Sequence, residues 1–304
     1  MKNQIEQYQK QILASEPELT IHTVDINSEG LVNNIVIINK SRVFRFPKHD
    51  WAVNHLRQEA NCLALAHRHV QMPLPQWTVY DGEIIGTPIA SYDWIPGRAL
   101  QQFEILRLPE RDQDALAEQL ATFLRQMHQI PRHEVRDAEI GRSVTSRSHN
   151  DWISLYGRVQ EHLYPHLMAV SKEWVEQHFA PVLADPCFMA CDEAFINGDL
   201  GQYHLLYNPK TRRLNGIIDF GTAGIGDPAV DFACLLNQYG EPFLRRMGKY
   251  YPNVGRLIER ARFWAGTLEL QWLLGGLRYP DEPSWFMVHI GRARDMLPVG
   301  SGWE

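Results

Sequence analysis

Residues 195–221 read FINGDLGQYHLLYNPKTRRLNGIIDFG, and they carry most of what this sequence says about its fold and chemistry. Asp199 and Asp219 each follow a short apolar run, and the chain between them has the pattern of a β-hairpin. The turn is predicted at an Asn-Pro pair, and the strands at residues 205–207 and 214–218. Such a hairpin brings its two ends to one side of a sheet. One carboxylate can then hold a divalent metal while the other receives a proton, a division that phosphoryl transfer requires.

Four short motifs follow one another in this region in a characteristic order. They are Gly198-Asp199-Leu200, His204, Asp219-Phe220-Gly221 and Gly226-Asp227-Pro228 with Asp231. In this order they resemble the aminoglycoside phosphotransferase family, and the resemblance extends from about Gly30 to Asp231. The sequence YHLLYN…GIIDFG most resembles that of the branch that phosphorylates the 2″-hydroxyl of aminoglycosides.

The resemblance implies an α+β, two-lobed protein-kinase-like fold, with a small β-rich N-terminal lobe and a larger, mainly helical C-terminal lobe. We expect the nucleotide-binding lobe at residues 1–92, a hinge at 93–97 and the helical lobe at 98–304. The helical lobe is expected to hold both the catalytic segment and the acceptor site. A chain of 304 residues is long enough to bury two separate cores.

Composition limits the class of protein. Apolar residues make up 44% of the chain and charged residues 22%, as in ordinary soluble proteins. A net charge of −6 argues against nucleic acid as a partner and suits a cationic small molecule. Residues 1–20 are polar, no apolar run approaches the ~20 residues of a membrane span, and the four cysteines lack zinc-site spacing. We therefore expect a cytoplasmic enzyme with reduced cysteines and without a membrane partner.

The resemblance also implies roles for residues of the catalytic segment. Asp199 would be the catalytic base or hydroxyl-orienting carboxylate, and Asp219 and His204 would bind Mg²⁺. His204 stands where kinase-like enzymes most often have asparagine, and because Mg²⁺ prefers oxygen ligands a packed histidine is the alternative. Asn197 stands where the family usually has histidine.

The first lobe is predicted to begin with strands at residues 31–38 and 42–46, preceded by Gly30. A glycine lets backbone N–H groups approach a phosphate closely, so Gly30 is the candidate for the loop over the nucleotide phosphates. A turn without a ligand is the alternative reading.

Arg45 occupies the strand position where kinase-like enzymes carry the lysine that holds the α- and β-phosphates. Glu59, fourteen residues later on a predicted helix, is its expected partner, and Lys48 is a second candidate cation. Arginine supplies the same charge with a bulkier, bidentate head. A surface arginine and an exposed helical glutamate are the alternative.

Two further sets of residues are candidates for ligand contacts. The hinge is expected to meet the nucleoside through Tyr92, Trp94 and Ile95, with packing between the lobes as the alternative for the two aromatic residues. A cationic acceptor needs carboxylates, and sugar rings pack on aromatic faces, so the acceptor candidates are Glu241, Glu269 and Trp272.

Helices dominate the second lobe. Apolar spacing predicts an amphipathic helix over residues 110–129, and further helices over 150–168 and 172–183. Asp227 and Asp231 are expected to cap the start of a later helix.

The sequence therefore favours a small-molecule kinase that transfers the γ-phosphoryl of ATP or GTP, with Mg²⁺, to a hydroxyl of an aminoglycoside. A macrolide or another small metabolite is an alternative acceptor. Arg45, Asn197 and His204 depart from the residues usual at these positions. These substitutions leave open a nucleotide-binding protein without transferase activity. A metal-dependent hydrolase using the same two carboxylates is a third possibility.

Overall fold

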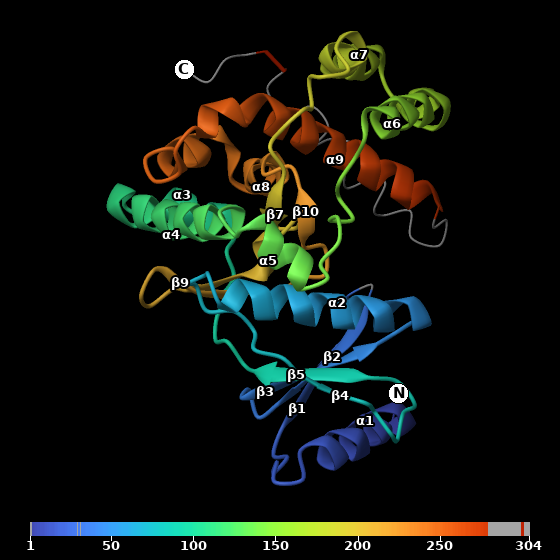
Figure 1. Cartoon of the computed structure of the whole chain (residues 1–304), viewed down its shortest axis with the longest axis vertical. Coiled ribbons are helices and arrows are strands. Elements are labelled where there is room, and N and C mark those ends of the chain that lie inside the picture. The colour runs from blue at the N-terminus through green and yellow to red at the C-terminus, as the bar shows by residue number, and fades with distance from the viewer. Residues whose placement is uncertain (1, 29, 31, 279–298, 301–304) are drawn as a thin grey trace.

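The computed structural model describes residues 2–28, 30, 32–278 and 299–300, which form two lobes (Figure 1). The smaller lobe is an antiparallel five-stranded sheet of order β1-β2-β3-β5-β4, with one helix on each face. Its elements are α1 Lys2–Ser15, β1 Val24–Asn27, β2 Asn33–Ile38, β3 Arg42–Pro47, α2 Asp50–His67, β4 Thr78–Tyr80 and β5 Ile89–Asp93.

The burial of β3 shows how this sheet is covered. Four consecutive residues at its centre are buried, because α1 covers one face and α2 the other. The β2–β3 turn has Asn39 and Lys40 at φ 55° and 50°, the geometry of a tight two-residue hairpin. The core on the α1 side consists of Ile12, Val36, Ile38, Phe44, Phe46 and Ile89.

The larger lobe is mainly helical. Its helices are α3 Gln102–Arg107, α4 Glu110–His128, α5 Arg132–Asp137, α6 His149–His162, α7 Ala169–Ala184, α8 Ala229–Met247 and α9 Ile258–Arg278. Its short strands are β6 Arg98–Ala99, β7 Ala194–Ile196, β8 Leu205–Asn208, β9 Arg213–Ile217 and β10 Gly224–Gly226. Helix α8 is kinked at Gly240, whose φ is 75°. None of the described helices combines the length and apolar composition needed to cross a bilayer.

The catalytic hairpin has the predicted form. Strands β8 and β9 pair antiparallel around the turn, and β6 joins them as a third strand. Asn208 holds the turn through its side-chain oxygen, which accepts the N–H of Lys210 at 3.0 Å. The expectation of a two-lobed α+β chain with a β-rich first lobe is confirmed.

Some expected elements differ from those observed. The strand before the hinge, which the sequence pattern predicts at residues 84–92, starts at Ile89, because residues 81–88 form turns that include two positive-φ glycines. The helix expected to reach residue 168 ends at His162, and Pro165, which has no N–H to donate, lies in a single 3₁₀ turn after it. Residues 279–298 and 301–304 of the expected helical lobe lie outside the described residues.

Candidate active site

The loop after β7 carries the catalytic candidate Asp199 and is fixed by a carboxylate from another element. Gly198 has φ 84°, a conformation that favours glycine. Its N–H donates to Asp231 Oδ1 at 2.7 Å, and the Asn197 N–H donates to Asp231 Oδ2 at 3.1 Å. Asp231 also accepts from His128 Nε2 at 2.9 Å. Asp231 therefore satisfies free N–H groups of this loop and does not cap a helix as expected, whereas Asp227 does cap α8, by accepting the Ala229 N–H at 2.9 Å.

Asn197 links the two loops that carry the candidate carboxylates, Asp199 and Asp219. Its side-chain Nδ2 donates to the carbonyl of Asp219 at 2.9 Å, and its Oδ1 accepts the N–H of Asp199 at 3.0 Å. The residue is fully buried. One amide group therefore connects both loops, which is possible because asparagine carries a donor and an acceptor on the same carbon.

His204 lies between the two carboxylates. Its Nδ1 is 2.7 Å from the carbonyl oxygen of Asp199, which can only accept, so Nδ1 carries the proton. Its Nε2 lies 3.5 Å from Asp219 Oδ2. In the neutral ring, Nε2 is then an acceptor that faces a carboxylate oxygen, an arrangement that suits a shared cation.

The two aspartates have opposite pKa shifts. Desolvation raises the pKa of Asp199, and the negative charges of Asp219 and Asp231 act in the same direction. Burial also acts to raise the pKa of Asp219, but Arg45, His204 and the Gly221 N–H outweigh it, so its pKa is lowered. The site therefore contains one carboxylate with increased basicity and one that stays ionised, the pattern of an acid–base residue beside a metal ligand.

Arg45 and Glu59 form the predicted ion pair. Arg45 Nη1 donates to Glu59 Oε1 at 3.1 Å, and both side chains are almost fully buried. Burial raises the pKa of Glu59 to about 7, while Arg45 and the Phe220 N–H favour its charged form. The Arg45 guanidinium also lies 4.8 Å from the ring centre of Trp77, a contact that the sequence analysis did not predict.

Glu59 also contacts the loop that follows Asp219. Its Oε1 accepts the N–H of Phe220 at 3.0 Å, so one oxygen serves both Arg45 and Phe220. A Cβ at Gly221 would lie 3.4 Å from Glu59 Oε2 and 3.3 Å from Asp219 Oδ1. The small lobe is therefore attached directly to the metal-candidate loop of the large lobe.

Gly30 lies in the turn between β1 and β2, where the phosphate loop was expected. Its carbonyl accepts from Lys48 Nζ, which also donates to the carbonyl of Ser28 at 2.6 Å. Lys48 therefore ties this turn to the end of β3.

The hinge candidates lie in three different environments. Tyr92 is buried in β5, and its ring stacks on Trp77 with centroids 6.3 Å apart. Trp94 donates its N–H to Ser41 O at 2.8 Å, so this backbone donor already has a partner. The side chain of Ile95 lies over β9, where a Cβ on Gly216 would approach its Cγ2 to 2.9 Å.

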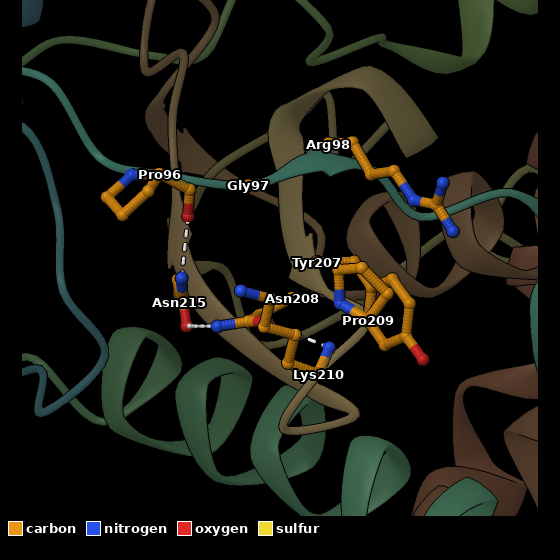
Figure 2. A pocket seen from close by; sticks show the side chains of 8 residues that line it. All are labelled: Pro96, Gly97, Arg98, Tyr207, Asn208, Pro209, Lys210 and Asn215. Carbon is orange, nitrogen blue, oxygen red and sulfur yellow. Dashed lines mark hydrogen bonds between the residues drawn. The ribbon is translucent and has the colours of Figure 1, made fainter. Parts of the chain in front are cut away.

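A shallow pocket of about 310 Å³ lies beyond the hinge, beside the turn of the catalytic hairpin (Figure 2). Asn215 borders it and donates from Nδ2 to the carbonyl of Pro96 at 2.6 Å. Its lining includes neither Asp199 nor Asp219. We therefore place the chemistry at the two carboxylates and not in this pocket.

The three acceptor candidates lie in different environments. Both carboxylate oxygens of Glu241 accept from the buried Arg262, at 2.6 and 2.9 Å, so its charge is already paired. Glu269 is buried, contrary to an exposed role in binding a cation. Trp272 is exposed, with 41% of its surface accessible.

Metal-binding groups of three or more His, Cys, Asp or Glu are absent among the described residues. Asp219 Oδ2 and His204 Nε2 lie 3.5 Å apart, so a cation that also binds phosphate oxygens and water could take both as ligands and would need no more from the protein. The residues present therefore fit a magnesium ion that arrives with a nucleotide.

Comparisons with known proteins agree with this geometry. Residues 24–264 match the model of the phosphotransferase enzyme family. Viomycin phosphotransferase of Streptomyces vinaceus is 30% identical over 256 residues, which cover 81% of this chain and 85% of the relative. The GDP complex of wild-type aminoglycoside 2′-phosphotransferase-IIIa superimposes with a TM-score of 0.84 at 27% identity, covering 95% of this chain and 96% of the other.

A GDP and kanamycin complex of APH(2″)-IIIa gives a TM-score of 0.82 at 28% identity, covering 95% and 97% of the two chains. The predicted family and the kinase-like fold are thus confirmed. The relatives are phosphotransferases, and the solved structures hold a nucleotide. The chain belongs to the phosphotransferase enzyme family, and it is a small-molecule kinase with a hydroxyl group as acceptor.

Proposed function

We propose that this enzyme transfers the γ-phosphoryl of ATP or GTP to a hydroxyl of a cationic antibiotic, with the 2″-hydroxyl of an aminoglycoside as the first candidate. The similarity over nearly the whole chain to a structure with bound GDP and kanamycin supports this choice. The relative from Streptomyces vinaceus makes viomycin the second candidate.

The observation that carries the proposal is the placement of Asp199 and Asp219 on either side of His204, whose ring nitrogens lie 3.9 Å from Asp199 Oδ2 and 3.5 Å from Asp219 Oδ2. The raised pKa of Asp199 and the lowered pKa of Asp219 support it. Asp199 accepts a hydrogen bond from the acceptor hydroxyl, aligns its oxygen with the γ-phosphate and takes up its proton as the new bond forms. A base with increased proton affinity suits this step. Its half-exposed side chain leaves it accessible to an incoming acceptor.

Asp219 and His204 are the residues we assign to Mg²⁺, which when bound neutralises part of the phosphate charge. Asp219 stays ionised beside Arg45, and Nε2 of His204, 3.5 Å from Asp219 Oδ2, can bind the same cation when the ring is neutral. The Asn197 amide fixes the main chain at both aspartates, so the acceptor side and the metal side keep their separation.

Nucleotide binding is assigned to the small lobe and the hinge. Arg45, oriented by Glu59, balances charge on the α- and β-phosphates, and the turn at Gly30 covers them. The proposed nucleoside contacts are Tyr92, Trp94 and Ile95. On the acceptor side we retain Trp272 as a surface for ring packing, since both glutamates of that set are buried or paired.

The test is nucleoside diphosphate release with ATP and with GTP, each against a panel of aminoglycosides, viomycin and a macrolide. Asp199→Asn is the matched control, since it preserves shape and removes the base. Turnover that rises with one acceptor and is lost in the variant supports the proposal. Nucleotide binding without acceptor-dependent turnover would show a binding protein, and phosphate release without acceptor would show a hydrolase.

A further inference from the structure

The segment that follows α5 runs directly beside β10 and extends the small β7–β10 sheet (Figure 1). We call residues 141–146 the strap. Ser143 N–H donates to Ile225 O at 2.9 Å, and Ile225 N–H donates to Gly141 O at 2.9 Å. A Cβ on Gly224 would lie 2.5 Å from Ser143 N, so glycine is required for this close approach. The strap is therefore fixed to the sheet next to the catalytic loop.

Ser143 points from the strap into the active-site framework. Its hydroxyl donates to the carbonyl of Thr222 at 2.7 Å, and the residue is buried. A serine hydroxyl has one proton, which this carbonyl uses, so in the 2.7 Å contact with Thr145 Oγ1 it is Thr145 that donates. Ser143 Oγ also accepts the Thr145 N–H at 3.2 Å. Its hydrogen-bonding capacity is fully used, which fixes its rotamer.

Thr222 connects Ser143 to both catalytic loops. Its hydroxyl donates to the carbonyl of Asn197 at 2.8 Å, and Asn197 in turn bonds the main chain of Asp199 and of Asp219. A Cβ at Gly198 would approach Ser143 Oγ to 3.1 Å and Thr222 O to 3.2 Å. The strap hydroxyl thus lies where the two loops meet.

We infer that Ser143 is a positioning residue for phosphoryl transfer, which sets the separation of Asp199 and Asp219 through Thr222 and Asn197. It contacts no reacting atom. Its contribution is geometric, since a small displacement of an oriented base has a large effect on the rate of a reaction that depends on alignment. This inference rests on the proposed function only for its expected effect on kcat.

The test compares Ser143→Ala with Ser146→Ala. Ser146 lies on the same strap, and its hydroxyl donates to Ile225 O at 2.8 Å, so it joins the strap to β10 without contacting Thr222. Both variants lose one strap hydroxyl. Only Ser143→Ala is expected to lower kcat, by about tenfold, the effect of one lost hydrogen bond on the alignment. KM for the nucleotide should stay within about twofold in both.

Hydrogen exchange supplies a measurement that needs no acceptor. Amides of residues 197–200 and 219–223 should exchange faster in Ser143→Ala than in wild type, at a temperature where both are fully folded, and not in Ser146→Ala. Unchanged exchange in Ser143→Ala overturns the inference. So does faster exchange with an unchanged kcat, or an equal loss of kcat in both variants.

The two proposals fail in different ways. A wild-type chain that transfers phosphate to no acceptor refutes the proposed function, whereas the exchange comparison still decides whether Ser143 holds the two loops together.

Discussion

At the scale of single residues, the proposed function assigns the role of base to Asp199 and that of metal ligand to Asp219. Asp199→Asn should lower kcat by about 10²–10⁴-fold and leave nucleotide affinity nearly unchanged. Asp219→Asn should weaken nucleotide binding itself, and only when Mg²⁺ is present. Turnover kinetics and calorimetric titration with and without Mg²⁺ measure the two effects. Identical behaviour of the two variants would refute the assignment.

A second residue-scale prediction concerns His178, which is buried between Trp174 and Phe263. Burial lowers its pKa to about 4 from 6.5. As pH falls below 6.5 the unfolded chain binds this proton before the folded chain does, so folding stability is lost progressively down to pH 4. The expected loss between pH 7.5 and 5.0 is about 2 kcal/mol.

Urea unfolding of wild type and His178→Phe at both pH values measures this contribution. The variant keeps an aromatic ring in the slot and cannot titrate, so the pH dependence of its stability should be smaller by that amount. Equal pH dependence in both proteins would mean that the histidine is not kept neutral in the folded chain.

At the scale of elements, α9 packs against α7 through a glycine. A Cβ on Gly266 would lie 2.5 Å from the His178 ring, whereas a Cβ on Gly275, in the same helix, would meet no atom within 4 Å. Gly266→Ala should therefore destabilise the fold by about 1–3 kcal/mol. Gly275→Ala should stabilise it by about 0.5–1 kcal/mol, because alanine loses less entropy in a helix. Thermal unfolding of the two variants checks both signs.

Periodic elements were predictable from the sequence, and contacts between distant loops were not. The helix predicted at 110–129 is observed at Glu110–His128, because its apolar face has a regular spacing. The pairing of Arg45 with Glu59 followed from their places on a strand and the next helix. The strap hydroxyls carry no periodic signal, and helix α1 is mostly polar, so both are recognised only once the tertiary fold places them.

At the scale of the whole molecule, Glu59 joins the lobes where nucleotide is expected to bind. Glu59→Gln keeps an acceptor for the Phe220 N–H and removes the charge that orients Arg45. We expect about tenfold weaker nucleotide binding, and a smaller rise in Tm on adding nucleotide.

Glu134→Gln is the matched control. Glu134 also joins the lobes, by accepting from His69 Nε2 at 3.0 Å, but it is not part of the catalytic centre. This variant should bind nucleotide like wild type. If both variants lose affinity equally, lobe attachment in general, and not the orientation of Arg45, controls binding.

The amide bridge at Asn197 has a consequence for the chemical ageing of the enzyme. Asn197-Gly198 is an Asn-Gly pair, the sequence in which the glycine nitrogen most readily attacks the asparagine side chain and deamidates it. Here that nitrogen is held by Asp231, and the side chain is bonded at both ends. Deamidation would replace the donor that Asp219 uses with a negative charge between two aspartates.

The folded chain should therefore protect this pair, while denaturant should expose it. The Asn215-Gly216 pair in β9, whose asparagine is half-buried, serves as an internal comparison. Mass spectrometry after incubation at alkaline pH should show Asn197 intact in the folded enzyme and converted in urea, with a smaller difference at Asn215. Enzyme that has been unfolded for a time would then lose part of its activity permanently, even after the chain has refolded.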